Sequence, residues 1–187
     1  MEKPRYDLPD DLELTMTPVG VMHSPYQFHP GTPRQPAATS DPDVEGTIVL
    51  RPGLQNLVRD LDGFSHIWVL FWFNYSRGWN HTVRPPRDGA WRGLYATRAP
   101  HRPNPLGLSV VPLKRVEGRV LTVGAHDILN GTPILDIKPY VAYADAIPDA
   151  RSGWVDELGP DAGPDHRDWR ADKGYEPPPA SDVPTEE

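Results

Sequence analysis

The sequence predicts a mainly β fold, a small antiparallel or mixed barrel with one or two short helices. Short runs of β-branched, aromatic and aliphatic residues alternate with Gly, Pro, Asn or Asp, a pattern typical of many short strands. The expected strands are residues 47–50, 67–73, 107–113, 119–123, 134–137 and 140–143. No G-x-G triplet occurs, so the dinucleotide-binding fingerprint of doubly wound α/β folds is missing.

One segment has the spacing of an amphipathic helix. Between Pro52 and Gly63, apolar residues recur at i, i+3, i+4 and i+7, at Leu54, Leu57, Val58 and Leu61. Proline near the start and glycine at the end suit helix boundaries. We therefore expect a helix over residues 54–61.

Length and composition predict one domain with a real core. The chain has 187 residues, of which 37% are hydrophobic, with six Trp and seven Tyr. We expect a barrel domain over 14–147 and an acidic, Pro/Gly-rich tail over 148–187, partly docked through Trp154 and Trp169. The absence of cysteine excludes disulfides, thiolate metal sites and a cysteine nucleophile. The start lacks a secretory signal and no run of about 18 apolar residues occurs, so we expect a cytoplasmic protein.

The net charge of −7 is unevenly distributed along the chain. Residues 1–140 carry 15 basic and 14 acidic side chains, whereas residues 141–187 carry 4 and 12. Between 84 and 119, eight basic residues accompany two acidic ones, a run suited to contact with phosphates. A solvated face balanced by acids elsewhere is the alternative.

The most informative stretch is the loop over residues 95–109. The run from Arg102 to Pro105 must be stiff and non-helical, because proline fixes φ and restricts the residue before it. Arg98, His101, Arg102 and Asn104 would project from a pre-set backbone, which suits recognition of an anionic or polar ligand. A structural turn capped by arginines is the alternative.

Five motifs in this order resemble one known family. They are Met-Thr-Pro-Val-Gly-Val-Met-His-Ser-Pro-Tyr at 16–26, Pro-Arg-Gln-Pro at 33–36, Leu-Asp-Gly-Phe-Ser-His-Ile-Trp-Val-Leu at 61–70, the loop at 95–109 and Asp-Ile-Leu-Asn-Gly-Thr-Pro-Ile-Leu-Asp-Ile-Lys-Pro-Tyr at 127–140. The set resembles the TrmO (TsaA/YaeB-like) family of S-adenosylmethionine-dependent tRNA methyltransferases, over roughly residues 14–154. The resemblance implies a compact, non-Rossmann barrel that binds S-adenosylmethionine.

The resemblance also implies a set of cofactor-binding residues. Carried over motif by motif, these are Pro33, Arg34, Gln35, Asn74, Tyr75, Arg98, Leu108, Asp127, Ile128, Leu129 and Asn130. Arg98 suits the cofactor carboxylate, because its planar fork allows a bidentate contact. Backbone groups at Ile128 and Leu129 are expected at the adenine edge. Without the resemblance, residues 127–131 would be read as a plain turn with Asn-Gly at its tip.

Two positions depart from the family pattern. Asn74 stands where relatives commonly have His, and Asn130 stands where they have Asp before Gly-Thr-Pro. Each departure removes an ionisable group and keeps a hydrogen-bonding one, so cofactor binding can survive while acceptor choice can change. His23, next to Ser24, is either a site residue or a structural one. No H-E-x-x-H or similar ligand cluster occurs, and we expect no catalytic metal.

The implied acceptor is N6 of threonylcarbamoyladenosine beside the tRNA anticodon. An in-line methyl transfer needs no nucleophilic side chain, but the acceptor nitrogen must lose a proton. Candidate proton acceptors are Tyr95, His101 and Asp136, the last of which could instead form a structural ion pair. Candidate RNA-binding residues are Arg84, Arg87, Arg92, Arg102 and Asn104.

Other expectations concern assembly and alternative functions. The resemblance implies a homodimer with the cofactor cleft near the subunit contact. The tail is too short and too polar for the second domain that many bacterial relatives carry. A same-fold methyltransferase acting on a small metabolite, and a non-catalytic S-adenosylmethionine-binding module, therefore stay open as alternatives.

Overall fold

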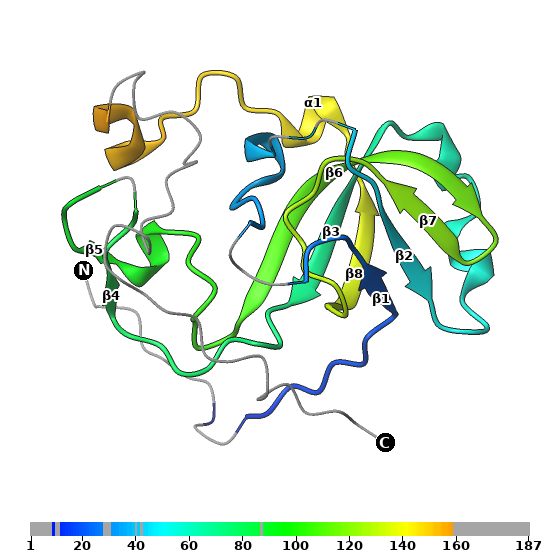
Figure 1. Ribbon diagram of the computed structural model, residues 1–187, viewed down its shortest axis with the longest axis horizontal. Coiled ribbons are helices and arrows are strands. Elements are labelled where there is room, and N and C mark those ends of the chain that lie inside the picture. Colours follow the sequence, from blue (N-terminus) through cyan, green and yellow to red (C-terminus); the bar gives the residue numbers. More distant parts are fainter. Residues whose placement is uncertain are drawn as a thin grey trace.

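Six antiparallel strands form a closed barrel, so the predicted mainly β barrel is confirmed (Figure 1). The computed structural model describes residues 9, 12–27, 31–39, 41, 43–86 and 88–158. The strand order around the barrel is β1-β2-β7-β6-β3-β8. The strands are β1 Gly20–His23, β2 Gly46–Leu50, β3 His66–Trp72, β6 Leu106–Glu117, β7 Val120–Val123 and β8 Pro133–Pro139.

The core lies inside the barrel because alternate residues of each strand point inward. In β3, Ile67, Val69 and Phe71 are buried, whereas the residues between them lie on the outer wall. The same alternation buries Ile48 and Leu50 of β2. The alternation that predicted the strands therefore also selects the core.

Gly107 of β6 leaves room for the largest ring of this core. Gly107 pairs with Phe71 across the β3–β6 ladder, and a Cβ on Gly107 would lie within the Phe71 ring. Phe71 also packs edge-on against Phe73, with ring centroids 5.1 Å apart. The glycine of the Leu-Gly-Leu-Ser run is thus required by close packing.

The barrel closes where the first strand meets the last. Gly20 pairs with Ile134, and Val21 pairs with Pro133. The bonds continue past the ladder, because Met22 N donates to Thr132 O at 2.9 Å and Gly131 N donates to Met22 O at 2.8 Å. The loop that precedes β8 is therefore fixed to the end of β1.

Five of the six expected strands are present, and the sixth is wrong. Residues 140–143 do not form a strand, because the last ladder bond, from Tyr140 N to His66 O, ends the pairing there. The chain then turns into a short helix, α1 (Ala142–Asp145), in which Asp145 accepts a hydrogen bond from Val141 N at 2.7 Å. Strand β1 (Gly20–His23) was not predicted from the sequence.

The helix expected over 54–61 is also wrong. The segment forms two 3-10 turns, η2 (Gln55–Val58) and η3 (Leu61–Gly63). Asp60 lies between them in the left-handed conformation, with φ 64°, which interrupts any continuous helix. Of the apolar stripe, Val58 is buried, Leu54 and Leu61 pack partly buried against the core, and Leu57 is 74% exposed. A helix this short has little stability of its own.

A small unit lies beside the barrel, on the side away from η2 and η3 (Figure 1). Strands β4 (Thr82–Val83) and β5 (Arg92–Gly93) pair here and lead into the 3-10 turn η4 (Leu94–Ala96). The turn η5 (Gly153–Leu158) docks on this unit, with Trp154 Nε1 donating to Ala96 O at 2.9 Å.

Another 3-10 turn, η1 (Pro36–Ala38), follows the Pro-Arg-Gln motif. Within the described ranges, no helix has the length and apolar character needed to cross a membrane.

We expect Gly107→Ala to lower the free energy of unfolding by about 1–3 kcal/mol, the usual cost of overpacking a core. The added methyl group can be accommodated only if the Phe71 ring moves. Urea unfolding followed by circular dichroism measures the change, with Gly93→Ala as the control, since nothing lies within 4 Å of a Cβ there. Equal stability of Gly107→Ala and the wild type would contradict this packing.

Candidate functional site

Arg98 joins two motifs that are far apart in the sequence. Its Nη1 donates to Oε1 of Gln35 at 2.6 Å, across 63 residues of chain. Gln35 in turn donates from Nε2 to the carbonyl of Arg34 at 2.8 Å, which orients its amide oxygen toward Arg98. The Pro-Arg-Gln and Ala-Thr-Arg motifs therefore meet, and the Arg98 side chain remains exposed to a ligand.

Asp127, which belongs to a third motif, lies within the electrostatic influence of Arg98. Its Oδ1 accepts a hydrogen bond from Ser109 Oγ at 2.7 Å. Burial raises the pKa of the Asp127 carboxyl to about 6, while the Ser109 bond and the positive charge of Arg98 act in the opposite direction. A carboxyl group with this pKa changes charge just below neutral pH, which is common at functional sites.

The end of β3 supplies Asn74 and Tyr75. The Asn74 Oδ1 atom is buried and has no hydrogen-bond partner within the described part of the chain. Tyr75 is 63% exposed, and its hydroxyl lies 3.5 Å from the position that a Cβ on Gly131 would take. Because an unpaired buried oxygen is costly, Asn74 is suited to accept a hydrogen bond from a ligand.

Asn130 connects the loop before β8 to the end of β1. Its Oδ1 accepts from Ser24 N at 3.1 Å, and its Nδ2 donates to Gln27 Oε1 at 3.3 Å. Its backbone N donates to Tyr26 O at 2.8 Å. An aspartate could not donate the Nδ2 bond, so the asparagine at this position has a specific structural use.

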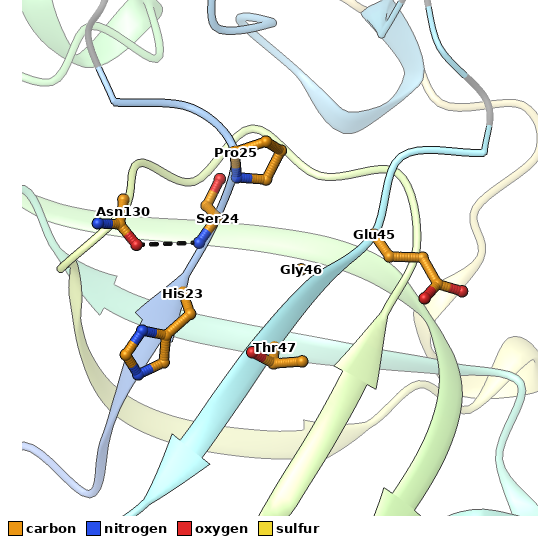
Figure 2. A pocket seen from close by; sticks show the side chains of 7 residues that line it. All are labelled: His23, Ser24, Pro25, Glu45, Gly46, Thr47 and Asn130. Atoms are coloured by element: carbon orange, nitrogen blue, oxygen red, sulfur yellow. Dashed lines mark hydrogen bonds between the residues drawn. The ribbon is translucent and has the colours of Figure 1, made fainter.

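Asn130 also lines an open pocket of about 320 Å³ between the ends of β1 and β2 (Figure 2). The other lining residues are His23, Ser24, Pro25, Glu45, Gly46 and Thr47. His23 and Thr47 are direct partners across the β1–β2 ladder. His23, which the sequence left open, therefore lies at a pocket that shares Asn130 with the predicted cofactor loop.

The other predicted cofactor residues differ in what they can offer. Ile128 is 1% exposed with its side chain in the core, and its N–H donates to His126 Nδ1 at 3.3 Å. Because this N–H is already engaged, Ile128 can offer a ligand only its backbone carbonyl oxygen. Leu108 is 54% exposed on the outer wall of β6, next to the inward-facing Ser109. Pro33 and Leu129 are half-buried in their loops.

His126 is a buried residue that the sequence reading did not select. It is fully inaccessible, and burial lowers its pKa to about 4. Its Nδ1 accepts from Ile128, so the neutral ring carries its proton on Nε2, which has no partner among the described residues. A Cβ on Gly46 would lie 2.6 Å from that atom, and the Tyr26 ring packs edge-on at 5.2 Å.

The three candidate proton acceptors are not brought together. Tyr95 is 79% exposed and packs under the guanidinium of Arg102, 5.4 Å from the ring centroid. His101 Nδ1 lies 3.1 Å from the carbonyl oxygen of Arg77. Asp136 forms an ion pair with Lys138 at 2.7 Å on the wall of β8, so the alternative of a structural ion pair is present.

The predicted RNA-binding residues are of two kinds. Arg92 is paired with Asp88 at 2.6 Å and stacks on Trp154. Arg102 donates hydrogen bonds to the carbonyls of Thr97 and Ala99. Both arginines therefore stabilise the protein's own structure. Arg84 and Asn104 are exposed, and Arg87 lies outside the described residues.

In the described part of the chain, no three His, Asp or Glu side chains are placed to hold a metal ion.

The most informative residue that the sequence reading missed is Ser109. It occupies an inward-facing position of β6 between Gly107 and Val111, and it is 5% exposed. A hydroxyl at a core position of an alternating strand needs a partner, which signals a nearby polar group. That signal was present in the Gly-Leu-Ser-Val-Val run.

We expect Asp127→Asn to change the pH dependence of stability. Folding raises the pKa of Asp127, so ionisation of its carboxyl group between pH 4 and 6 lowers the free energy of unfolding. Folding lowers the pKa of His126, so protonation of its ring lowers the free energy of unfolding as the pH falls from 6.5 to 4. In the wild type, these two contributions to the pH dependence of the free energy of unfolding have opposite signs. In Asp127→Asn the free energy of unfolding should rise from pH 4 to 6.5, and at pH 7 it should exceed that of the wild type by roughly 3 kcal/mol at most.

Urea unfolding over a pH series measures this change, with Asp136→Asn as the control because its exposed ion pair contributes little. Lower stability of Asp127→Asn at pH 7 would show that the carboxylate stabilises the fold, against this account.

Comparison with known proteins places this geometry in a family. The model of the tRNA-methyltransferase O N-terminal domain matches residues 21–146. The tRNA (adenine(37)-N6)-methyltransferase of Escherichia coli strain K12 is 41% identical over 145 residues, covering 73% of this chain and 62% of the relative. A probable S-adenosyl-L-methionine-binding protein of Pyrococcus abyssi is 38% identical over 146 residues, covering 78% of each chain.

A solved structure agrees with the sequence comparison. The crystal structure of TrmO from Pseudomonas aeruginosa superimposes with a TM-score of 0.66 at 38% identity, covering 78% of this chain and 64% of that one. This chain therefore spans less than two thirds of the length of the E. coli and P. aeruginosa proteins. The barrel, the loops that meet at Arg98 and these matches together show that the chain belongs to the TrmO family, through its tRNA-methyltransferase O N-terminal domain.

Proposed function

We propose that this protein is an S-adenosylmethionine-dependent N-methyltransferase that modifies adenosine 37 of tRNA, at N6 of threonylcarbamoyladenosine. One observation carries the proposal: Arg98 donates a hydrogen bond to Gln35 of a distant family motif, and its positive charge acts on the carboxyl group of Asp127 in a third motif. The name of the E. coli relative supports N6 of adenine 37 in tRNA as the acceptor, and the name of the P. abyssi relative supports S-adenosylmethionine as the cofactor.

The residues at the junction suit the polar groups of the cofactor. The exposed guanidinium of Arg98 fits a carboxylate, with Gln35 holding the side chain in place. The unpaired Oδ1 of Asn74 fits an ammonium group, which has donors and no acceptor. The loop at 128–129 presents backbone groups to a nucleobase edge, since Ile128 buries its side chain.

In methyl transfer from a sulfonium, the main task of the protein side chains is to position the two reactants. When bound, the cofactor supplies a methyl group on a sulfonium, which is already a good electrophile. The chain's own part is to align the acceptor with that methyl group and to limit water, and no nucleophilic side chain is required. Asp136 is paired with Lys138 and Tyr95 packs against Arg102, so His101, three residues after Arg98 in the sequence, is the better suited candidate to accept the proton.

The proposal extends to domain organisation, compartment and assembly. We propose that residues 14–147 carry the activity, with 148–187 as an appended tail that docks through Trp154. Its acceptor would place the protein in the cytoplasm. We also propose a homodimer with the cofactor cleft near the subunit contact, which sedimentation velocity can test.

A small metabolite is the second candidate acceptor. Two of the four arginines expected to bind RNA, Arg92 and Arg102, are engaged within the protein, which reduces the charge available for phosphates. A non-catalytic cofactor-binding module would bind S-adenosylmethionine and transfer no methyl group.

We expect Arg98→Ala to weaken S-adenosylmethionine binding by about 1.5–3 kcal/mol, the usual loss for a hydrogen bond to a charged group. Arg98→Lys should recover only part of this, because an ammonium cannot form the bidentate contact. Isothermal titration calorimetry measures both, with Arg59→Ala as a matched control, since Arg59 is an exposed arginine between η2 and η3. Unchanged affinity in a folded Arg98→Ala variant would assign Arg98 a structural role.

We expect Arg84→Ala to weaken tRNA binding and to flatten its salt dependence. Each lost phosphate contact should lower the slope of log K against log salt by about 0.9 on duplex or 0.7 on single-stranded RNA. Filter binding over a salt series measures the slope, again with Arg59→Ala as the control, and cofactor affinity should stay constant. Weak, salt-independent tRNA binding by the wild type, with turnover on a metabolite extract, would favour the second candidate.

A further inference from the structure

Three large aromatic side chains project from the small unit beside the barrel, and the cofactor junction uses none of them. Trp79 is 45% exposed, Trp91 is 69% exposed and Tyr95 is 79% exposed. We call these three residues the aromatic surface. Exposed rings of this size on one short segment indicate an interaction site, because their apolar faces gain most from contact with a partner.

The fold holds the three rings on one framework. Trp91 directly precedes the β4–β5 pairing, where Arg92 lies opposite Val83. Leu94 N donates to His81 O at 2.9 Å, which places the Tyr95 backbone beside the chain that leads to Trp79. Trp79 packs edge-on against His81 at 5.0 Å, and Tyr95 packs against Arg102 at 5.4 Å. These contacts reduce the ordering cost of binding.

The segment that carries the aromatic surface has an excess of basic side chains along the sequence, and the docked turn η5 brings Glu157 to 4.0 Å from Arg92. Residues 77–102 contain six arginines and one acidic residue. That acid, Asp88, is already paired with Arg92 at 2.6 Å, while Arg84 is exposed. Arginines interleaved with exposed aromatic rings are the composition that binds single-stranded nucleic acid, in which bases stack on rings and phosphates meet cations.

We propose that Trp79, Trp91 and Tyr95 form a stacking surface for unpaired bases of an RNA loop. This inference rests on the proposed function, and it names how the acceptor RNA is held. Its position agrees with that role, because the turn that carries Tyr95 leads within three residues to Arg98 of the cofactor junction. Bases stacked on Tyr95 would hold a neighbouring nucleotide close to the methyl donor.

Binding of two RNA probes by the full chain tests the proposal. The first is a labelled hairpin with an unpaired loop, and the second is a blunt duplex built from the same stem. Trp91→Ala and Tyr95→Ala should each weaken hairpin binding by about 5- to 100-fold, the effect of losing one stacked base, and should change duplex binding little. The salt slope should stay that of the wild type, because no phosphate contact is lost.

Conservative and matched variants separate stacking from other roles. Tyr95→Phe should bind the hairpin like the wild type, because stacking needs the ring and not the hydroxyl. Tyr143→Ala removes an aromatic ring that is 93% exposed on α1 and should have no effect on binding. Circular dichroism and cofactor affinity confirm that each variant is folded.

Three results would overturn the proposal. The first is that both alanine variants bind the hairpin with wild-type affinity. The second is that they lose hairpin and duplex binding equally. The third is that they lose a dimer while RNA affinity is unchanged, which would make the aromatic surface a subunit interface. If tRNA is methylated normally while the alanine variants bind RNA like the wild type, only this inference fails. If the wild type binds cofactor but neither binds nor methylates RNA, the proposed acceptor fails with it.

Discussion

Pairing of the first barrel strand with the last is the constraint on which the candidate site depends. The β1–β8 ladder is short, but its hydrogen bonds continue through Thr132 and Gly131, so the loop before β8 is held to the end of β1. That loop carries Asp127 and Asn130, and Asn130 in turn fixes Ser24 and Gln27. Opening the barrel at this seam would therefore release the pocket and the cofactor loop together.

Several polar groups near the family motifs are buried without hydrogen-bond partners or have shifted pKa values. Asp127 is half-buried with a raised pKa, and among the described residues Asn74 has an unpaired buried oxygen and His126 is buried with an unpaired Nε2. Each of these arrangements costs stability, since buried polar groups normally find partners. Their concentration near the family motifs fits the trade between stability and function that binding sites commonly show.

Strand alternation made most of the fold predictable, and its limits explain the errors. Phe71 and Val111 lie inside because inward-facing apolar positions recur every second residue. The helix expected near Val58 failed because helical spacing over two turns cannot distinguish a helix from two 3-10 turns around a left-handed Asp60. The motif residues came from family resemblance, but the contact of Arg98 with Gln35 depends on the path of two loops, which no local pattern encodes.

Locating the transferred methyl group is the most direct test of the account. The full chain would be incubated with S-adenosylmethionine bearing an isotopically labelled methyl group and with unfractionated tRNA, and the RNA would be digested for nucleoside mass spectrometry. We expect label on N6 of a threonylcarbamoyl-modified adenosine, and loss of that label in Arg98→Ala. Label that appears only in a small metabolite, or cofactor binding with no transferred methyl group, would contradict it.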